Sequence, residues 1–201
     1  LFEKGDLTGA ANHYERILTW KQHVLGKEHL RTAETLFILA AIYQKIGLII
    51  KAESLFLNSL SIVEKVFDAE HSFALMVLNG LGSLYEKQGF YAKAEPLYLR
   101  YLAISEQVSG ADHPETVRAL NKLGLLYLNR GLYGKAEPLY LRSLAILEKV
   151  LGAEHPETAT VLSNLGQLYQ HEGLYGKAEP LYLRSLAIRE KVLGAEHTDT
   201  A

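Results

Sequence analysis

Cysteine is absent from this chain of 201 residues, which excludes disulfides and thiolate metal sites and is compatible with a reducing compartment. No apolar run approaches the roughly 18 residues that a membrane-spanning helix requires. The first residues, Leu1 to Asp6, hold no basic region followed by an apolar core, as a secretion signal would. From these absences we expect a soluble, cytoplasmic protein without a membrane partner.

A marked excess of charge of either sign is also missing. The 21 lysines and arginines nearly balance the 23 aspartates and glutamates, and the formal net charge is −2. Because this balance provides no overall attraction for a phosphate backbone, we expect no nucleic-acid partner. The sequence also lacks a glycine-rich phosphate loop, a His-Glu-x-x-His motif and a paired acid and base beside a nucleophile. We therefore expect no enzyme activity, no cofactor and no metal site.

The dominant feature that is present is an internal repeat of 42 residues. The segments Tyr133–Gly152 and Tyr175–Gly194 differ only at Leu147 and Arg189. More diverged copies precede them at the same spacing, at residues 91–110, 49–67 and 10–26. A fixed period of this size is typical of a repeat array, in which each unit buries its apolar face against its neighbours.

Each period contains two segments with helical periodicity. In residues 115–130, apolar or small residues recur at i, i+3, i+4 and i+7, on one side of a helix: Leu120, Leu123, Gly124 and Tyr127. The second segment, residues 133–151, has a wider apolar surface. Gly131 and Gly152 stand where these helices would end, and the His-Pro-Glu-Thr sequence that follows is typical of a helix start. Each repeat is thus predicted to be a helical hairpin, with no strand.

Comparison between repeats assigns roles to particular columns. A histidine recurs once in each linker, at His29, His71, His113, His155 and His197. Copies that lie one repeat apart cannot converge on one metal ion, so we interpret them as capping or turn-packing residues. Trp20 replaces the isoleucine of the other repeats, which indicates core packing. Leu147 is replaced by Lys, Val, Ser and Arg elsewhere, which predicts solvent exposure.

The repeat also carries the residues of a known family. Six of them match the small and large positions of the tetratricopeptide pattern: Leu162, Leu165, Gly166, Tyr169, Ala178 and Tyr182. The phrases at residues 126–133 (Leu-Tyr-Leu-Asn-Arg-Gly-Leu-Tyr) and 144–156 (Leu-Ala-Ile-Leu-Glu-Lys-Val-Leu-Gly-Ala-Glu-His-Pro) resemble the 42-residue kinesin-light-chain class. The resemblance implies an all-α, right-handed superhelical solenoid of antiparallel helix pairs.

We expect residues 1–201 to form a single array, with a partial repeat at about 1–30 and full repeats at about 31–72, 73–114, 115–156 and 157–198. Neither end shows the polar capping repeat that such arrays normally carry, so we expect a fragment of a longer array. Apolar residues left uncovered at the two ends predict weak end-to-end self-association: Leu7, Tyr14, Leu18, Leu181, Leu186 and Val192.

The resemblance further implies that one face of each first helix lines a concave groove. Residues on that face change from repeat to repeat, whereas the leucine, glycine and tyrosine columns on the opposite face are nearly constant. In the kinesin-light-chain class, adjacent asparagines of this helix bind the backbone of an extended peptide; each helix here keeps at most one of the pair. We predict a groove for a protein or an extended peptide, acidic and with an apolar anchor. The candidate residues are Phe37, Asn79, Lys87, Arg118, Asn121, Lys122, Leu125, Leu128, Asn164, Gln167 and Gln170.

Within this prediction, Leu125 and Leu128 form an apolar pocket and the basic residues attract acidic side chains. Two other functions are compatible with such an array. The first is a structural or self-associating spacer, for which end-to-end contacts would be the signature. The second is a regulatory interaction arm of a larger multidomain enzyme, with the catalytic domain outside this sequence. No heptad segment that would join the chain to a motor protein is present.

Overall fold

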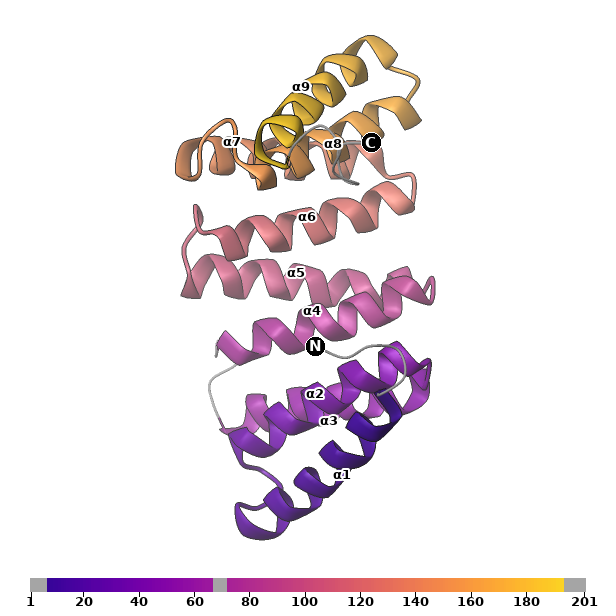
Figure 1. The fold of residues 1–201 in the computed structure, drawn as a ribbon, viewed down its shortest axis with the longest axis vertical. Helices are drawn as coiled ribbons and strands as arrows, with labels where there is room; N and C mark the ends of the chain where they lie inside the picture. Colours follow the sequence, from indigo (N-terminus) through magenta and orange to yellow (C-terminus); the bar gives the residue numbers. More distant parts are fainter. Residues whose placement is uncertain (1–6, 67–71, 194–201) are drawn as a thin grey trace. The chain divides into compact units, whose positions relative to one another are not determined.

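The structure of the protein is a computed structural model that describes residues 7–66 and 72–193. All regular secondary structure in these ranges is α-helical (Figure 1). The helices are α1 (Leu7–Val24), α2 (Leu30–Ile46), α3 (Ile49–Val66), α4 (Ser72–Lys87), α5 (Tyr91–Val108), α6 (Pro114–Asn129), α7 (Tyr133–Val150), α8 (Pro156–His171) and α9 (Tyr175–Leu193). No helix in the described ranges is both long and apolar enough to cross a membrane.

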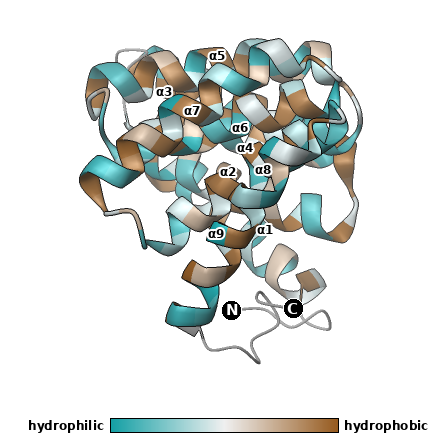
Figure 2. Ribbon diagram, turned by 90° about the horizontal axis from the view of Figure 1, so that it is seen from above, coloured by the Kyte–Doolittle hydropathy of each residue, from teal (hydrophilic) through white to brown (hydrophobic). Residues whose placement is uncertain are grey.

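The chain divides into two compact units, Leu1–Val108 and Ser109–Ala201. Unit 1 contains α1 to α5, and unit 2 contains α6 to α9. The hairpins are α2 with α3 and α4 with α5 in unit 1, and α6 with α7 and α8 with α9 in unit 2. Within each unit the second helix of one hairpin also packs on the first helix of the next, as α3 does on α4 and α7 on α8. Most helices carry both hydrophobic and hydrophilic residues, as amphipathic helices do (Figure 2).

A glycine that recurs in the first helices lets the second helix of the same hairpin pack closely against the first. A Cβ atom added to Gly82 would lie 2.6 Å from the Tyr98 ring, and one added to Gly124 would lie 2.8 Å from the Tyr140 ring. Both tyrosines belong to the second helix of the same hairpin, and both are buried. The predicted role of this column, close approach of the paired helix, is therefore confirmed.

Glycines in the left-handed conformation end the first helices, as predicted. Gly47 has φ +91°, and its N–H donates to Gln44 O while the N–H of Leu48 donates to Tyr43 O. This arrangement satisfies carbonyl groups at the end of α2 that the helix leaves open. Gly131, after the first helix α6, also has positive φ, of +70°, and so does Gly152, after the second helix α7, with +98°.

The recurring linker histidines are helix caps. Nδ1 of His29, His113 and His155 accepts a hydrogen bond from the backbone N–H two residues ahead, at 3.1, 3.1 and 3.2 Å. The other two copies, His71 and His197, lie outside the described residues. No group of histidine, aspartate or glutamate side chains in the described ranges is arranged to hold a metal ion. The interpretation of these histidines as caps is confirmed for the three that are described.

Two predictions about single residues are wrong. Leu147 is buried, with 1% of its surface exposed, because α7 is covered by both α6 and α8. The lysine that takes its place in α1 is tolerated because its long side chain reaches polar atoms: Lys21 Nζ donates to Thr35 Oγ1 at 2.8 Å. Trp20 was expected in the core, but 60% of it is exposed. It lies on a face of α1 that the contact with α2 leaves uncovered.

Candidate functional site

A tyrosine in the first helices α2, α4 and α8 connects each of them to the helix before it. The hydroxyl of Tyr85 in α4 donates to Glu53 Oε1 in α3 at 2.6 Å, and Tyr169 in α8 donates in the same way to Glu137 in α7 at 2.6 Å. Burial, followed by this hydrogen bond, raises the pKa of each of these tyrosines to about 12. They remain neutral donors, and each connects its first helix to the second helix of the hairpin before it.

A lysine of the second helix covers each of these tyrosine rings. Lys93 Nζ lies 4.9 Å from the centre of the Tyr85 ring and 3.6 Å from Glu53 Oε1. Lys177 lies 4.9 Å from the centre of the Tyr169 ring. The cation–π contact recurs because the lysine and the tyrosine both recur in the sequence, and at Lys93 an ion pair accompanies it.

The predicted groove residues of unit 1 do not lie on one open surface. The Phe37 ring packs edge-on against Phe56 and Phe73, with ring centroids 5.7 Å apart in each pair, so it lies between α2, α3 and α4. Asn79 is half-buried, and its Oδ1 is shielded from solvent and accepts no hydrogen bond from the described residues. Only Lys87, at the end of α4, is exposed. Phe37 is therefore a packing residue, contrary to its predicted place in the groove.

The predicted residues of unit 2 are more accessible. Gln167 and Gln170 of α8 are exposed, and Gln170 Oε1 accepts from the hydroxyl of Tyr182 at 2.8 Å. Arg118 of α6 is exposed and forms an ion pair with Glu115 at 2.9 Å. Lys122, Leu125, Asn121 and Asn164 are half-buried.

Leu128 does not contribute to an open apolar pocket. Only 5% of its surface is exposed, whereas Leu125, three residues earlier, is half-buried. In other hairpins the same column holds Glu86 and Gln170, which accept the hydroxyl of Tyr98 and of Tyr182. This column therefore faces the tyrosine of the second helix, and a leucine there extends the packed interface.

The asparagine column also faces the hairpin interior. In α8 the equivalent residue is Ser163, whose Oγ lies 2.8 Å from Ser185 Oγ of α9 and 3.2 Å from Arg189 Nη2. Asn121 has its Oδ1 shielded and without a partner among the described residues, as Asn79 does. These two amide oxygens are shielded from solvent, so a peptide would reach them only after a side-chain rotation.

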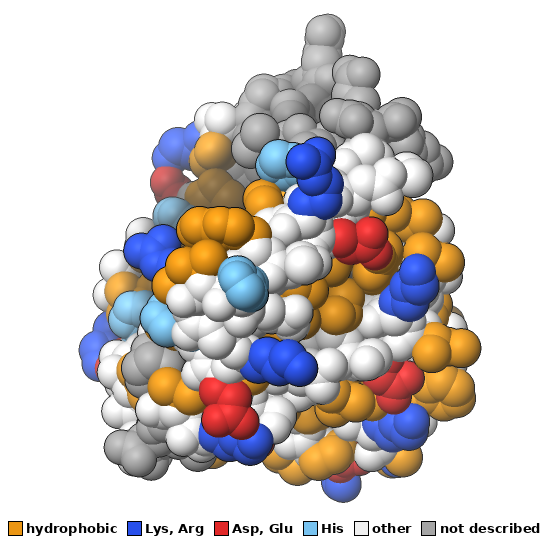
Figure 3. Space-filling view, turned by 90° about the horizontal axis from the view of Figure 1, so that it is seen from below, with side chains coloured by type: hydrophobic (Ala, Val, Ile, Leu, Met, Phe, Trp, Pro, Cys, Tyr) orange, Lys and Arg blue, Asp and Glu red, His pale blue; other side chains and the backbone are white. Residues whose placement is uncertain are grey.

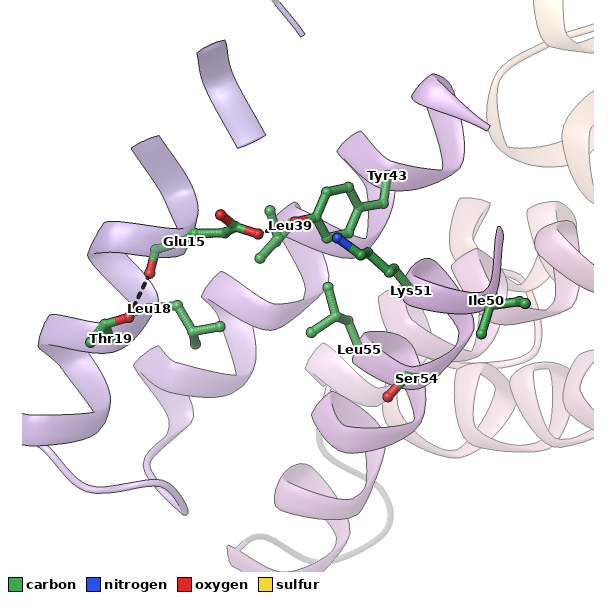
Figure 4. Close-up of a pocket in the computed structure, with 9 residues that line it drawn as sticks. All are labelled: Glu15, Leu18, Thr19, Leu39, Tyr43, Ile50, Lys51, Ser54 and Leu55. Atoms are coloured by element: carbon green, nitrogen blue, oxygen red, sulfur yellow. Dashed lines mark hydrogen bonds between the residues drawn. The ribbon is translucent and has the colours of Figure 1, made fainter. Parts of the chain in front are cut away.

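A pocket of about 530 Å³ opens between α1, α2 and α3 (Figure 4). Both apolar and polar side chains line it. The lining residues are Glu15, Leu18, Thr19, Leu39, Tyr43, Ile50, Lys51, Ser54 and Leu55. Figure 4 shows the Lys51 amine beside the Tyr43 ring, 5.2 Å from its centre, and the Tyr43 hydroxyl donates to Glu15.

Sequence reasoning missed this pocket. The repeats do differ between the same two second helices, at residues that do not line the pocket. Ion pairs connect successive second helices elsewhere: Arg100 with Glu64 between α5 and α3, and Arg184 with Glu148 at 2.6 Å between α9 and α7. The equivalent positions in α3 and α1 are Asn58 and Gln22, which are uncharged. The crevice between α1 and α3 therefore lacks the ion pair that crosses the others.

A second pocket, of about 210 Å³, lies where the ends of α2 and α4 meet the start of α3. Its lining residues are Ala41, Gln44, Lys45, Ile49, Leu84, Lys87 and Gln88. On the face drawn in Figure 3, basic, acidic and apolar side chains are interspersed. This distribution agrees with the balanced charge of the sequence.

The tetratricopeptide repeat model matches residues 1–65, 35–107, 73–149, 118–191 and 157–201. Among solved structures, BtubC (BKLC) from P. vanneervenii aligns with TM-score 0.84 and 24% identity, covering 97% of this chain and 78% of that one. A putative kinesin light chain with nearly identical repeats from Podosopora anserina aligns with TM-score 0.83 and 25% identity, covering 94% and 90%. A Rap protein complexed with Competence and Sporulation Factor aligns with TM-score 0.70 and 19% identity, covering 98% and 57%. A comparison with curated proteins found no match.

These comparisons confirm the predicted all-α fold of antiparallel helix pairs and the resemblance to kinesin-light-chain-like repeats. The matches to the family model overlap one another from the first residue to the last, so no part of the chain lies outside the repeat pattern. The chain belongs to the tetratricopeptide repeat family.

Proposed function

We propose that this tetratricopeptide-repeat scaffold binds a protein or an extended peptide on the variable face of its first helices. The observation that carries the proposal is the division between constant columns that hold the hairpins together and variable columns that are exposed on the first helices. Constant residues pack the hairpin, cap the helix or connect it to its predecessor, as Gly124, His155 and Tyr169 do. The variable residues Lys87, Gln167 and Arg118 are exposed on the first helices.

Exposed positions that vary while the packed ones stay constant are the usual place for recognition on a repeat scaffold. A protein of the same fold is complexed with a partner in the Rap structure. The binding face we propose accordingly includes fewer residues than the face predicted from the sequence. In unit 2 it comprises the accessible or half-buried residues Arg118, Lys122, Leu125, Asn164, Gln167 and Gln170.

The ligand class we propose is an extended peptide with acidic residues and one apolar anchor. Lys122 and Arg118 attract the acidic side chains, and Leu125 contacts the anchor. Extended backbones present free amides and carbonyls, which amide side chains such as Asn164 and Gln167 can satisfy. We expect an affinity of order micromolar, because ordering a flexible peptide offsets much of the contact energy.

The test is a fluorescence-polarisation screen of a short-peptide library against the wild type and two single-leucine variants. Leu125→Glu introduces a charge on the first-helix face of unit 2. Leu141→Glu makes the same change on α7, where Leu141 is exposed, and serves as the matched control. We expect hits that Leu125→Glu weakens about tenfold and Leu141→Glu leaves unchanged. A full library without a hit, or equal loss in both variants, would contradict the proposal.

One observation favours a second function, a self-associating spacer. Large apolar side chains are exposed on α1, at Trp20 and Val24, and on α9, at Leu183 and Val192. In the interior hairpins the column of Trp20 is buried, as Ile62 and Ile146 are. The columns of Val24, Leu183 and Val192 are exposed there too, as Val66, Leu141 and Val150 are, so Trp20 carries this observation. Exposed apolar residues on one helix are candidates for burial against a second copy.

A further inference from the structure

The pocket at the ends of α2 and α4 is positively charged, and within the described ranges its charged groups make no contact that stabilises the fold. Lys45 and Lys87 both line it, and no acidic side chain does. Neither lysine forms an ion pair or a hydrogen bond with any residue that the structure describes. Glu86, the acid beside Lys87 in the sequence, accepts a hydrogen bond from Tyr98 at 2.8 Å.

Lysines near the end of a helix often serve the helix itself, by interacting with its last carbonyl groups. Here backbone N–H groups already donate to two carbonyls at the end of each of these helices, and neither lysine donates to one. At the end of α2, Gly47 N–H donates to Gln44 O at 3.2 Å and Leu48 N–H donates to Tyr43 O at 2.9 Å. At the end of α4, Gly89 N–H donates to Glu86 O at 2.9 Å. The two lysines are therefore not required as capping donors.

In unit 2, different side chains occupy the positions that correspond to this pocket. Two repeats further along the chain, Ile49 becomes Tyr133 and Lys87 becomes His171. The ring of Tyr133 stacks on the ring of His171, with centroids 6.1 Å apart and planes 16° from parallel. The lysine of α2 becomes Asn129. The repeat thus folds with an aromatic pair and no lysine at this corner, so the open basic pocket of unit 1 is not a requirement of the hairpin.

We propose that this pocket of unit 1 binds the carboxylate side chain of an acidic residue in the partner peptide. The proposal rests on the proposed function and names its ligand chemistry at one site. The two ammonium groups provide charge-assisted hydrogen bonds, and the amides of Gln44 and Gln88 provide further donors. Ala41, Ile49 and Leu84 form an apolar wall against which the methylene groups of a glutamate pack.

The experiment uses two peptides that differ only in charge, acetyl-Ala-Glu-Leu-Glu-Ala-amide and its Gln-for-Glu counterpart. Each is titrated into the isotope-labelled 201-residue chain while backbone amide chemical shifts are followed. We expect the glutamate peptide to shift the amides at the ends of α2 and α4 and to bind about tenfold more tightly than the glutamine peptide. The difference should decrease as salt is added, because exposed charges are screened. Equal binding of the two peptides would overturn the proposal.

A third peptide, the glutamine sequence with a free carboxyl terminus, separates the two sources of a carboxylate. Binding of this peptide at the strength of the glutamate peptide would assign the pocket to a chain terminus and overturn the side-chain assignment. Failure to bind it supports the assignment.

Variants of the protein test whether the preference for the glutamate peptide arises at this pocket. Lys45→Gln with Lys87→Gln should remove the preference for glutamate, whereas Lys27→Gln, at an exposed lysine of a linker, should leave it unchanged. Ile49→Tyr with Lys87→His copies the corner of unit 2 and should block the pocket while the chain keeps its helicity. Unchanged glutamate binding in both pocket variants would overturn the proposal. If the peptide shifts only amides of unit 2, the groove function stands and this pocket assignment fails.

Discussion

The hydroxyl of Tyr85 lies 2.6 Å from the carboxylate of Glu53, and this hydrogen bond connects the hairpin of α4 to the helix before it. The same bond recurs between Tyr169 and Glu137 in unit 2. At the first hairpin the repeat departs from the pattern, because Ala11 occupies the glutamate column and Glu15, one turn later, accepts from Tyr43 instead. The tyrosine–glutamate hydrogen bond is preserved although the glutamate stands at a different position of the repeat, which indicates that the fold depends on this bond.

This hydrogen bond predicts a loss of stability at high pH. The folded-state pKa of Tyr43, Tyr85 and Tyr169 is raised from 10.0 to about 12, first by burial and then by the glutamate. A pKa that is raised on folding stabilises the protein fully below about pH 10, and that contribution is lost as the pH rises through 12. Urea midpoints, followed by circular dichroism, should therefore decrease between about pH 10 and pH 12.

The variant Tyr85→Phe separates this effect from the deprotonation of lysines. It should lower the stability at neutral pH by about 0.5–1.5 kcal/mol, the usual net contribution of one hydrogen bond. It should also reduce the decrease in stability above pH 10, because one tyrosine that ionises late is gone. A pH dependence identical to that of the wild type would show that these tyrosines do not cause the loss.

The glycine column gives a second prediction. Gly124→Ala places a methyl group 2.8 Å from the buried ring of Tyr140, and we expect it to destabilise the chain by about 1–3 kcal/mol through overpacking. Gly134→Ala is the control, because nothing lies within 4 Å of the added atom and alanine favours the helix. Thermal melts should place the first variant below the wild type and the second at or above it. Equal midpoints for the two variants would contradict the packing role.

Leu147 and Leu141 lie on the same helix, and they provide a third test. Leu147→Ala removes a fully packed side chain and should cost about 2–5 kcal/mol. Leu141→Ala removes a side chain that is 45% exposed, and its effect should be much smaller. The measurement is the free energy of unfolding in urea for both variants. Similar losses would show that the two columns do not differ in burial.

The histidine caps predict a fourth result. His155→Ala leaves the N–H of Glu157 without its side-chain acceptor and should cost about 0.5–2 kcal/mol. His155→Asn keeps an acceptor at the same place and should restore most of that loss. The comparison is again made by thermal melts, and a failure of asparagine to recover stability would indicate that the imidazole contributes by packing instead.

Self-association is the fifth prediction. If the exposed apolar residues of α1 bind a second copy, Trp20→Glu with Val24→Glu should reduce the sedimentation coefficient measured at high protein concentration. The pair Leu183→Glu and Val192→Glu tests α9 in the same way. A wild-type chain that stays monomeric up to about millimolar concentration would exclude the spacer function.

Much of the candidate site depends on which way a side chain points, and the sequence was a poor guide to that. Phe37 varies between repeats as surface residues do, yet it fills the space between Phe56 and Phe73. Leu128 also varies and is buried, because its column faces a tyrosine of the second helix. In both cases variation reflected repacking of an interface, where one residue changes together with its neighbours.

The pockets were beyond sequence reasoning for a related reason. A pocket forms where side chains from different helices leave a space unfilled, as those of α1, α2 and α3 do around Leu18, Tyr43 and Leu55. The size of that space depends on the distance between helices, which the period of the repeat does not contain.

By itself the sequence determined the helical hairpins, their boundaries at glycines, and their stacking, because a 42-residue period with apolar residues on one helical face leaves few other ways to bury that face. It also identified the histidine caps, whose role is local to one turn of chain. Only the tertiary structure decided that Leu147 is covered and Trp20 is not, and that Lys45 and Lys87 line one pocket. Those facts depend on which helices meet, and contacts between residues far apart in sequence are set by packing of whole helices.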